Sequence, residues 1–454
     1  MSETTPLSSA GPPPSAADVP ADTHHSGGGE HGRQRFPLYA RILIAMFIGA
    51  VVGIVLNRGG YASDKVTEVI RLPADLIIRA LRTLATPLVL FAILNAFVTT
   101  EIRGREGGRL FVLLITNTVA AIIIGLVVVN VLRPGRFVPR LGEEIRRGTQ
   151  QLDPNKRLDP LDIPKNAVPN HLLEPITAND VFKLILPALA FGIAIRQFKN
   201  RQIREGKTDY AGLERGIGIG FGLLLTVLLW VIAVIPLAVF CVVAAVVGRQ
   251  GPQALAEFLP FIVVVIIALL LQLAYYLLRI RFETRAGAFR VLGGVRDALT
   301  TAFSTASSTA TMPITYGNLI DKVKLRPKSA SLGALVGANF NNDGTALYEA
   351  VAALFIAQAI GRDLDFAHQI LVVLTAIVAS VGAAGIPEAG LVTMVLVLTA
   401  VGLPPAASLL LIPVDWFLDR CRTAINVMGD VTVATLLDAR ERREEPDPFP
   451  SDPP

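Results

Sequence analysis

The stretch VDWFLDRCRTAINVMGD, residues 414–430, places charged side chains inside sequence that is otherwise hydrophobic. It contains Asp415, Asp419 and Asp430 together with Arg422. An arginine fork binds a carboxylate through two parallel hydrogen bonds, and a carboxylate binds an ammonium group or a cation. The combination matches an amphoteric ligand that has an acidic side chain. The alternative is a set of buried ion pairs that hold helices together, such as Asp419 with Arg422 three residues later.

A helix would bring these side chains onto one face. No glycine or proline interrupts residues 414–428, so we predict a helix there. With about 100° between successive residues, a single arc of about 100° holds Asp415, Asp419, Arg422, Thr423, Asn426 and Asp430. A polar stripe on an apolar helix faces the interior of a bundle and not lipid. Its mixture of acids, arginine and amides favours a binding site over simple ion pairing.

Three further polar segments interrupt the apolar sequence after residue 285: FSTASSTATMP, NFNNDGT and SVGAAGIPEAG. Non-helical backbone at membrane depth is tolerated only where protein buries it or where it lines a wet cavity. Broken helices of this kind mark the binding sites of secondary transporters. The arms around the first and third segments, at 287–318 and 366–400, are too short for two full spans, which need about 40 residues. We predict two re-entrant hairpins, with Ser307, Ser308, Thr309 and Pro313 near the tip of the first. Close helix packing through small residues is the alternative.

The segment NNDGT lies between two half-length apolar stretches in residues 329–360. Asn341, Asp343 and Thr345 supply oxygen atoms, which are the ligands that hard cations prefer. A solvent-exposed turn would use the same residue types. The apolar flanks favour a cation site within a broken membrane helix.

The rest of the sequence has the composition of a membrane protein. Of 454 residues, 52% are hydrophobic and 17% are charged, whereas a soluble chain has about a quarter charged. The predicted membrane helices, each near or above about 20 residues, are 37–57, 72–99, 110–132, 178–197, 212–248 and 257–280. The run 212–248 contains Pro236 and is either two helices or one broken helix. Residues 133–176 are polar and are predicted to form an extramembrane loop.

The basic residues lie in short loops and tails, which fits membrane topology and not a nucleic-acid groove, despite a net charge of +5. Residues 1–36 are rich in Pro, Gly, Ser and Thr and are predicted to be a disordered cytoplasmic tail. Residues 439–454 form a second, charged tail. Cys241 and Cys421 imply neither a disulfide framework nor a metal motif. A hydrolase using Ser307 or Ser308 is disfavoured, because no G-x-S-x-G motif or partner base accompanies these serines.

Four motifs resemble those of the glutamate transporter family, the dicarboxylate/amino acid:cation symporters. In the order of the family they are TAFSTASSTATMPIT, NNDGTALYEAVAALFIAQ, GAAGIPEAGLVTMV and VDWFLDRCRTAINVMGD. The resemblance covers about 38–438 and implies an all-α, polytopic, inverted-repeat elevator transporter. Each protomer of a homotrimer would have eight transmembrane helices and two re-entrant hairpins. A membrane domain at 37–438 would divide into a scaffold, about 37–100 and 175–250, and a transport part, about 109–132 and 256–438.

The resemblance also implies roles for individual residues. Arg422 would take the side-chain carboxylate of the substrate and Asp419 its amino group. The other expected substrate contacts are Ser307, Ser308, Thr345, Gly385, Ile386, Thr423 and Asn426. Sodium would bind at Asp430 with Asn341 and the Gly337 backbone. A second sodium site would use Asp343 with Asn117 and Thr118.

Several positions bear on the coupling ion. Glu349 matches the proton carrier of the animal-type excitatory amino acid transporters, and Arg420 resembles the animal-type arrangement. Na⁺ coupling, H⁺ coupling and K⁺ counter-transport therefore stay open. Three features depart from the family pattern: Asn342 replaces the methionine of N-M-D-G-T, Leu113 and Leu114 replace a tyrosine pair, and Glu388 lies in the second hairpin tip.

Together these observations predict a secondary transporter and not an enzyme, with no cofactor besides its coupling ions. It would be a multi-pass protein of the plasma membrane, or of the inner membrane in a bacterium, and would not bind nucleic acid. The predicted activity is symport of aspartate or glutamate with Na⁺, H⁺ or both. A C4-dicarboxylate symporter is the second candidate, and a substrate-gated ion channel is the candidate from another class.

Overall fold

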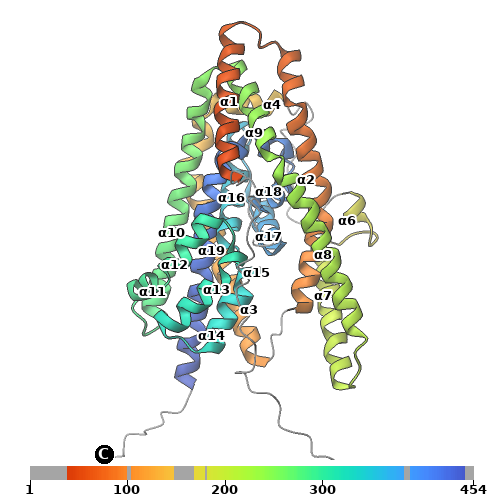
Figure 1. Cartoon of the computed structure of the whole chain (residues 1–454), viewed down its shortest axis with the longest axis vertical. Helices are drawn as coiled ribbons and strands as arrows, with labels where there is room; N and C mark the ends of the chain where they lie inside the picture. Colours follow the sequence, from red (N-terminus) through yellow and green to blue (C-terminus); the bar gives the residue numbers. More distant parts are fainter. Residues whose placement is uncertain (1–37, 100–103, 148–167, 179–180, 383–388, 445–454) are drawn as a thin grey trace, which may run out of the picture. The chain divides into compact units, whose positions relative to one another are not determined.

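The computed structural model describes residues 38–99, 104–147, 168–178, 181–382 and 389–444, all within the compact unit Leu38–Pro454. The regular elements in these ranges are all helices (Figure 1). Those of the first half are α1 (Leu38–Arg58), α2 (Asp64–Thr99), α3 (Gly104–Leu132), η1 (Pro134–Phe137), α4 (Pro139–Arg147), α6 (Glu174–Thr177), α7 (Val181–Arg204), α8 (Tyr210–Ala233) and α9 (Ile235–Gln250). Those of the second half are η2 (Pro252–Phe258), α10 (Leu259–Glu283), α11 (Ala288–Gly294), α12 (Arg296–Thr305), α13 (Ser308–Asn318), η3 (Leu319–Val323), α14 (Pro327–Ser331), η4 (Leu332–Val336), α15 (Gly337–Phe340), α16 (Asp343–Ala359), α17 (Phe366–Gly382), α18 (Ala389–Ala400), η5 (Pro405–Ala407) and α19 (Ser408–Glu444).

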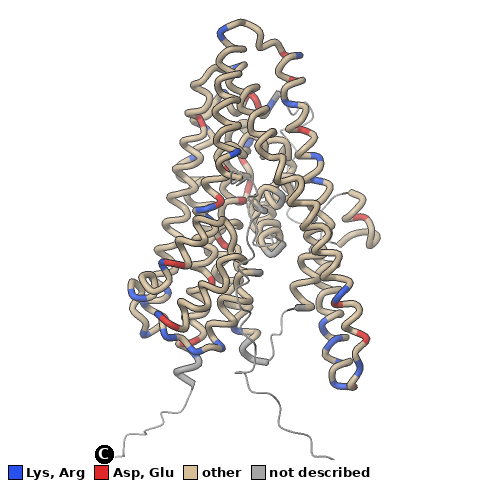
Figure 2. The backbone as a smooth tube through the Cα atoms, viewed as in Figure 1, with Lys and Arg blue, Asp and Glu red and all other residues tan. Residues whose placement is uncertain are grey.

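Five helical segments of the described chain are long and apolar enough to cross a membrane by length and composition. They are Leu38–Arg58, Asp64–Val98, Gly107–Phe137, Tyr210–Gln250 and Pro252–Glu283. Figure 2 shows charged residues gathered mainly near the helix ends, with a few inside the bundle. A polytopic helical membrane protein, as predicted, is what these features describe.

The predicted run 212–248 is one broken helix. It is interrupted at Val234, which separates α8 from α9. Pro236 is the second residue of α9, where its missing N–H costs no helical hydrogen bond.

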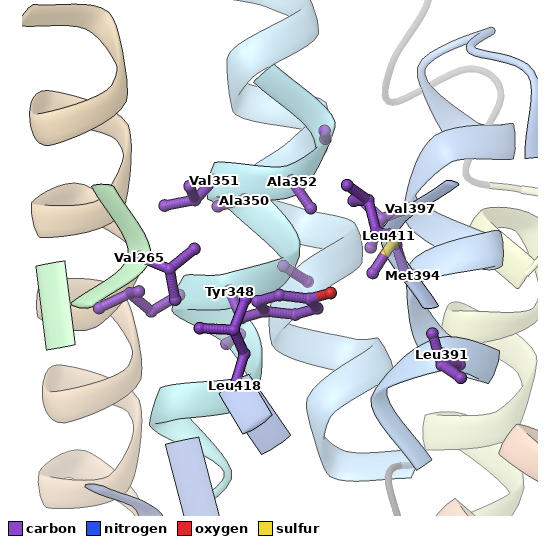
Figure 3. Close-up of a cluster of buried hydrophobic side chains, with 14 of the residues drawn as sticks. Val265, Tyr348, Ala350, Val351, Ala352, Leu391, Met394, Val397, Leu411 and Leu418 are labelled. Atoms are coloured by element: carbon purple, nitrogen blue, oxygen red, sulfur yellow. The ribbon is translucent and has the colours of Figure 1, made fainter. Parts of the chain in front are cut away.

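Helix α16 lies at the centre of the main core. All of its residues except Gln358 are buried. It contacts α3, α10, α17, α18 and α19. Figure 3 shows Tyr348 and Val351 of α16 among apolar side chains from these neighbours, including Val265, Met394 and Leu411. Because apolar residues surround α16 so completely, any polar side chain on it must find its partner inside the protein.

The prediction of a loop at 133–176 is wrong for its first part, since residues 134–147 form η1 and α4 and pack against α16. The Glu144 carboxylate is fully buried and pairs with Arg71 of α2 and Arg249 of α9. Because its charges are paired and its backbone packs closely on α16, the polar segment 134–147 can be buried. A polar sequence by itself does not reveal such partners.

At Gly142 the backbone of α4 lies so close to α16 that no side chain fits between them. A methyl group added there would overlap the carbonyl oxygen of Ala359 in α16. We therefore expect Gly142→Ala to destabilise the protein by about 1–3 kcal/mol, measured as a lower Tm of the purified protein in detergent. Gly216→Ala in α8 is the matched control, because a methyl group there meets no atom within 4 Å. Equal Tm values for the two variants would contradict the close packing of α4 on α16.

Candidate functional site

Residues 414–428 are helical as predicted, within the longer helix α19. The six residues of the predicted polar stripe are all buried, each at most 5% exposed. Helix α19 packs against α10, α12, α13, α15, α16 and α18. The stripe therefore points into the protein, as the helical arithmetic predicts.

Arg422 is the most enclosed charge in the stripe, with 1% of its side chain exposed. Its two terminal nitrogens donate to the carboxylate of Asp415 at 2.9 and 3.2 Å. Its Nε donates to Asp419 at 2.9 Å, and its guanidinium stands 4.3 Å from the ring centre of Tyr348. Burying an unpaired charge is costly, and these two acids neutralise the guanidinium.

Asp415 belongs to the predicted stripe, and the structure adds its role as the bidentate partner of Arg422. Its position seven residues before Arg422 is the signal, because residues seven apart share one helix face. Glu349, fully buried on α16, also lies within the electrostatic reach of Arg422 and beside Thr393 of α18. The guanidinium is therefore surrounded by acidic groups of α16 and α19.

The first predicted hairpin consists of α12 and α13, which contact one another. The chain turns at Ala306, whose φ of 51° is left-handed, and Ser307 caps α13 by accepting from the Ala310 N–H at 3.1 Å. Ser308 donates to the carbonyl of Ala338 at 3.3 Å. Pro313 lies inside α13 and not at the tip, which corrects that part of the prediction.

Arg420 reaches the same hairpin from the flank of α19. Its guanidinium donates to the carbonyls of Phe303 and Ser304 at 3.1 and 2.7 Å. It also lies over the ring of Tyr39 in α1. Arg420 thus binds free carbonyls at the end of α12, where a positive charge is favourable.

The second predicted hairpin is represented by α17 and α18, which contact one another. The predicted substrate contacts Gly385 and Ile386 lie outside the described residues, and so does Glu388.

The predicted break at NNDGT falls at Asn341 and Asn342, between α15 and α16. Asn426 of the stripe accepts from the Gly344 N–H at 2.7 Å and donates to Thr345 at 3.3 Å. Asn342 donates to the carbonyl of Ser380 in α17 at 2.8 Å. The asparagine that replaces methionine therefore hydrogen-bonds to the arm of the second hairpin.

One cluster of oxygen atoms surrounds Asp430. Asn341 donates to its carboxylate at 3.1 Å, and the Asn341 side-chain oxygen is buried with no hydrogen-bond partner. A methyl group on Gly337 would lie 2.5 Å from the same carboxylate, so the helix backbone approaches it closely. Carboxylate, amide and backbone oxygens in one buried place suit a hard cation.

A second cluster surrounds Asp343 at the start of α16. Thr118 of α3 donates to one carboxylate oxygen at 2.6 Å, and Tyr276 of α10 donates to the other at 2.5 Å. Arg279 of α10 donates to the side-chain oxygen of Asn117 at 2.6 Å. Asn117, Thr118 and Asp343 are the predicted residues of this cluster, whereas Tyr276 and Arg279 of α10 were not predicted. Leu113 and Leu114 pack against an apolar face of α19.

In the described chain no three His, Cys, Asp or Glu side chains come together as a transition-metal site would require. Membrane-length helices, broken helices and buried polar clusters between them define the architecture of a secondary transporter. Residues 38–440 match the sodium:dicarboxylate symporter family, and the chain belongs to that family.

Similar proteins cover nearly the whole chain. Excitatory amino acid transporter 1 of Ambystoma tigrinum is 31% identical, over 91% of this chain and 84% of its own length. Excitatory amino acid transporter 2 of Homo sapiens is 32% identical, over 86% of this chain and 76% of its own length. The corresponding transporter of Mus musculus is 32% identical over 87% and 77%.

Proposed function

We propose that this protein is a secondary active symporter that takes up aspartate or glutamate together with Na⁺. The observation that carries the proposal is the buried Arg422, held by two carboxylates, on the same helix as an oxygen-lined cluster around Asp430, eight residues further along. Membership of a sodium:dicarboxylate symporter family and similarity to excitatory amino acid transporters support the same activity.

In the proposed mechanism the side-chain carboxylate of the substrate replaces Asp415 at the guanidinium of Arg422. In this exchange one carboxylate takes the place of another, so the guanidinium charge of Arg422 stays compensated. Asp419 then binds the substrate amino group. The remaining contacts would come from Ser307, Ser308, Thr345, Thr423, Asn426 and the backbone of Gly385 and Ile386.

Sodium is proposed to bind Asp430, the Asn341 side-chain oxygen and the Gly337 backbone. A carboxylate supplies the negative charge, and the neutral oxygens complete the coordination shell. Because Asn341 directly precedes the segment that hydrogen-bonds to Asn426, a cation there would order the substrate side of the break as well.

At the level of architecture we propose a homotrimer in the plasma membrane, or in the inner membrane of a bacterium. Eight transmembrane helices and two re-entrant hairpins would divide into a scaffold, about 37–100 and 175–250, and a transport part, about 109–132 and 256–438. The transport part would slide as an elevator. The contacts of α1 and α2 with α7, α8 and α9, and of α16 with α3, α10, α17, α18 and α19, support this division.

Uptake of labelled aspartate into liposomes tests the proposal. We expect saturable accumulation against a gradient when sodium is higher outside, and none when the gradients are collapsed. Accumulation of succinate without aspartate would favour a C4-dicarboxylate symporter, since Asp419 would then bind no amino group. Conduction without accumulation would indicate a channel.

Glu349 tests whether protons take part. The carboxyl group is buried beside Arg422, where loss of its charge would change the local balance. With sodium equal on both sides, we expect a pH gradient of one unit to drive aspartate uptake in the parent protein, and Glu349→Gln to reduce this uptake to the level of empty liposomes. Glu68→Gln, at an exposed site on α2, is the control. Unchanged proton-driven uptake in the Glu349 variant would exclude it as the carrier.

A further inference from the structure

Helix α10 has a polar face of its own. Gln272, Tyr276, Arg279 and Glu283 lie four, three and four residues apart, which places them within an arc of about 60° on one side of the helix. Gln272 and Tyr276 are fully buried, and the Arg279 side chain is 10% exposed. A polar face on so apolar a helix points to a function inside the bundle.

Arg279 connects the polar face of α10 to α3. Its Nε and one terminal nitrogen donate to Glu283 at 2.5 and 3.1 Å, and its other terminal nitrogen donates to the Asn117 oxygen at 2.6 Å. That oxygen is one of the atoms expected to bind sodium. A guanidinium nitrogen therefore contacts the ligand atom that a metal ion would need.

The carboxylate of Asp343 is engaged in the same way. Hydroxyl groups of Thr118 and Tyr276 donate to its two oxygens. The Arg279 guanidinium lies close enough to interact electrostatically with this carboxylate. Each predicted ligand in the Asp343 cluster thus has a hydrogen-bonding or ionic partner supplied by the protein.

The charges of this cluster balance without a metal ion. The two carboxylates, Asp343 and Glu283, face two guanidinium groups, Arg279 and Arg440, the second of which lies 3.5 Å from Glu283. Asp430 differs, because in the described part of the chain its carboxylate is bound by the neutral amide of Asn341 and by no cationic side chain. The Asp430 carboxylate also lies near enough to Asp343 for the two to repel one another. The two clusters together hold three carboxylates and two guanidinium groups, which leaves one negative charge for one added cation.

We propose that Arg279 is a built-in cation that takes the place of a sodium ion at the Asp343–Asn117–Thr118 cluster, leaving the Asp430–Asn341 cluster to bind sodium. The inference rests on the proposed sodium-coupled function. Its consequence is that the protein moves fewer sodium ions per substrate than it would with a neutral residue at position 279. Because the guanidinium is covalently attached to the protein, it is not released on the other side of the membrane and supplies no driving force for uptake.

The ratio of sodium to aspartate flux in liposomes, measured with both species labelled, tests this. We expect Arg279→Met, which keeps the volume and removes the charge, to raise the ratio by about one sodium ion per aspartate, because the cluster then needs an added cation. Arg279→Lys should keep the parental ratio. Arg281→Met, at an exposed position two residues later, is the matched control. An unchanged ratio in Arg279→Met would overturn the inference.

A second measurement keeps Arg279 in place, in case its replacement prevents folding. If the guanidinium occupies the site, Asn117→Ala should change the apparent sodium affinity for uptake by less than about twofold, since Asn117 then binds no sodium. The same substitution combined with Arg279→Met should weaken sodium affinity by at least about tenfold relative to Arg279→Met alone. A tenfold loss in Asn117→Ala with Arg279 present would overturn the inference. Absence of any sodium-driven uptake in the parent protein would instead refute the proposed function.

Discussion

Arg422→Cys is expected to abolish high-affinity aspartate uptake and to shift preference toward small neutral amino acids. The substitution removes the only cationic side chain in the described polar stripe of α19 that faces inward. Loss of one partner from a buried, hydrogen-bonded charge pair costs about 3–5 kcal/mol, which corresponds to a loss of affinity of about 100-fold to a few thousand-fold. Competition of labelled-aspartate binding by aspartate and by neutral amino acids measures both parts of the shift.

Two companion variants separate recognition from folding. Arg422→Cys leaves Asp415 and Asp419 without their cation, so it is also expected to lower stability. Adding Asp415→Asn to Arg422→Cys removes one of the two excess charges and should restore part of the Tm without restoring aspartate binding. Arg420→Cys removes the arginine that binds the first hairpin and should keep acidic selectivity. Aspartate affinity at the parental level in Arg422→Cys would refute the role given to this arginine.

Asp430→Asn is expected to have the second largest effect, on the sodium dependence of uptake. The amide keeps an oxygen that can accept from Asn341 but removes the negative charge of the proposed cation site. We expect the apparent sodium affinity to fall by at least about tenfold, or by about 1.4 kcal/mol. Initial rates of aspartate uptake over a range of external sodium concentrations give this number.

A control exists on the same helix. Asp438 lies two turns further along α19 and pairs with Arg326 at 3.2 Å, away from the Asp430 cluster. Asp438→Asn should therefore leave the sodium dependence unchanged while lowering stability slightly. If both variants shift sodium affinity equally, the effect is a general one of α19 and the assignment of the cation site to Asp430 is wrong.

The helical stripe was predictable from the sequence because helix periodicity depends only on local spacing. Asp419, Arg422 and Asn426 are buried as the arithmetic requires, and the break at Asn341 lies where the NNDGT segment predicts it. The four motifs identify the family from the sequence alone. These signals are all local in the sequence, and the fold preserves them.

Partners that come from distant helices were not predictable in this way. Tyr276 and Arg279 lie in a stretch whose apolar residues predict an ordinary membrane helix, and only packing brings them to Asp343 and Asn117. The burial of Glu144 likewise depends on two arginines from other helices. Polar composition indicated a loop there, because composition carries no information about which charges will meet.

The unbroken length of α19 has a mechanical consequence. Arg422 and Asp430 lie eight residues apart on one helix, or about 12 Å along its axis. A substrate bound at Arg422 and an ion bound at Asp430 would both be attached to the same rigid helix. Moving one of these sites across the bilayer would therefore move the other by the same distance. The coupling ratio would then depend on which occupied sites allow α19 to move. Direct contact between the substrate and the ion would not be required.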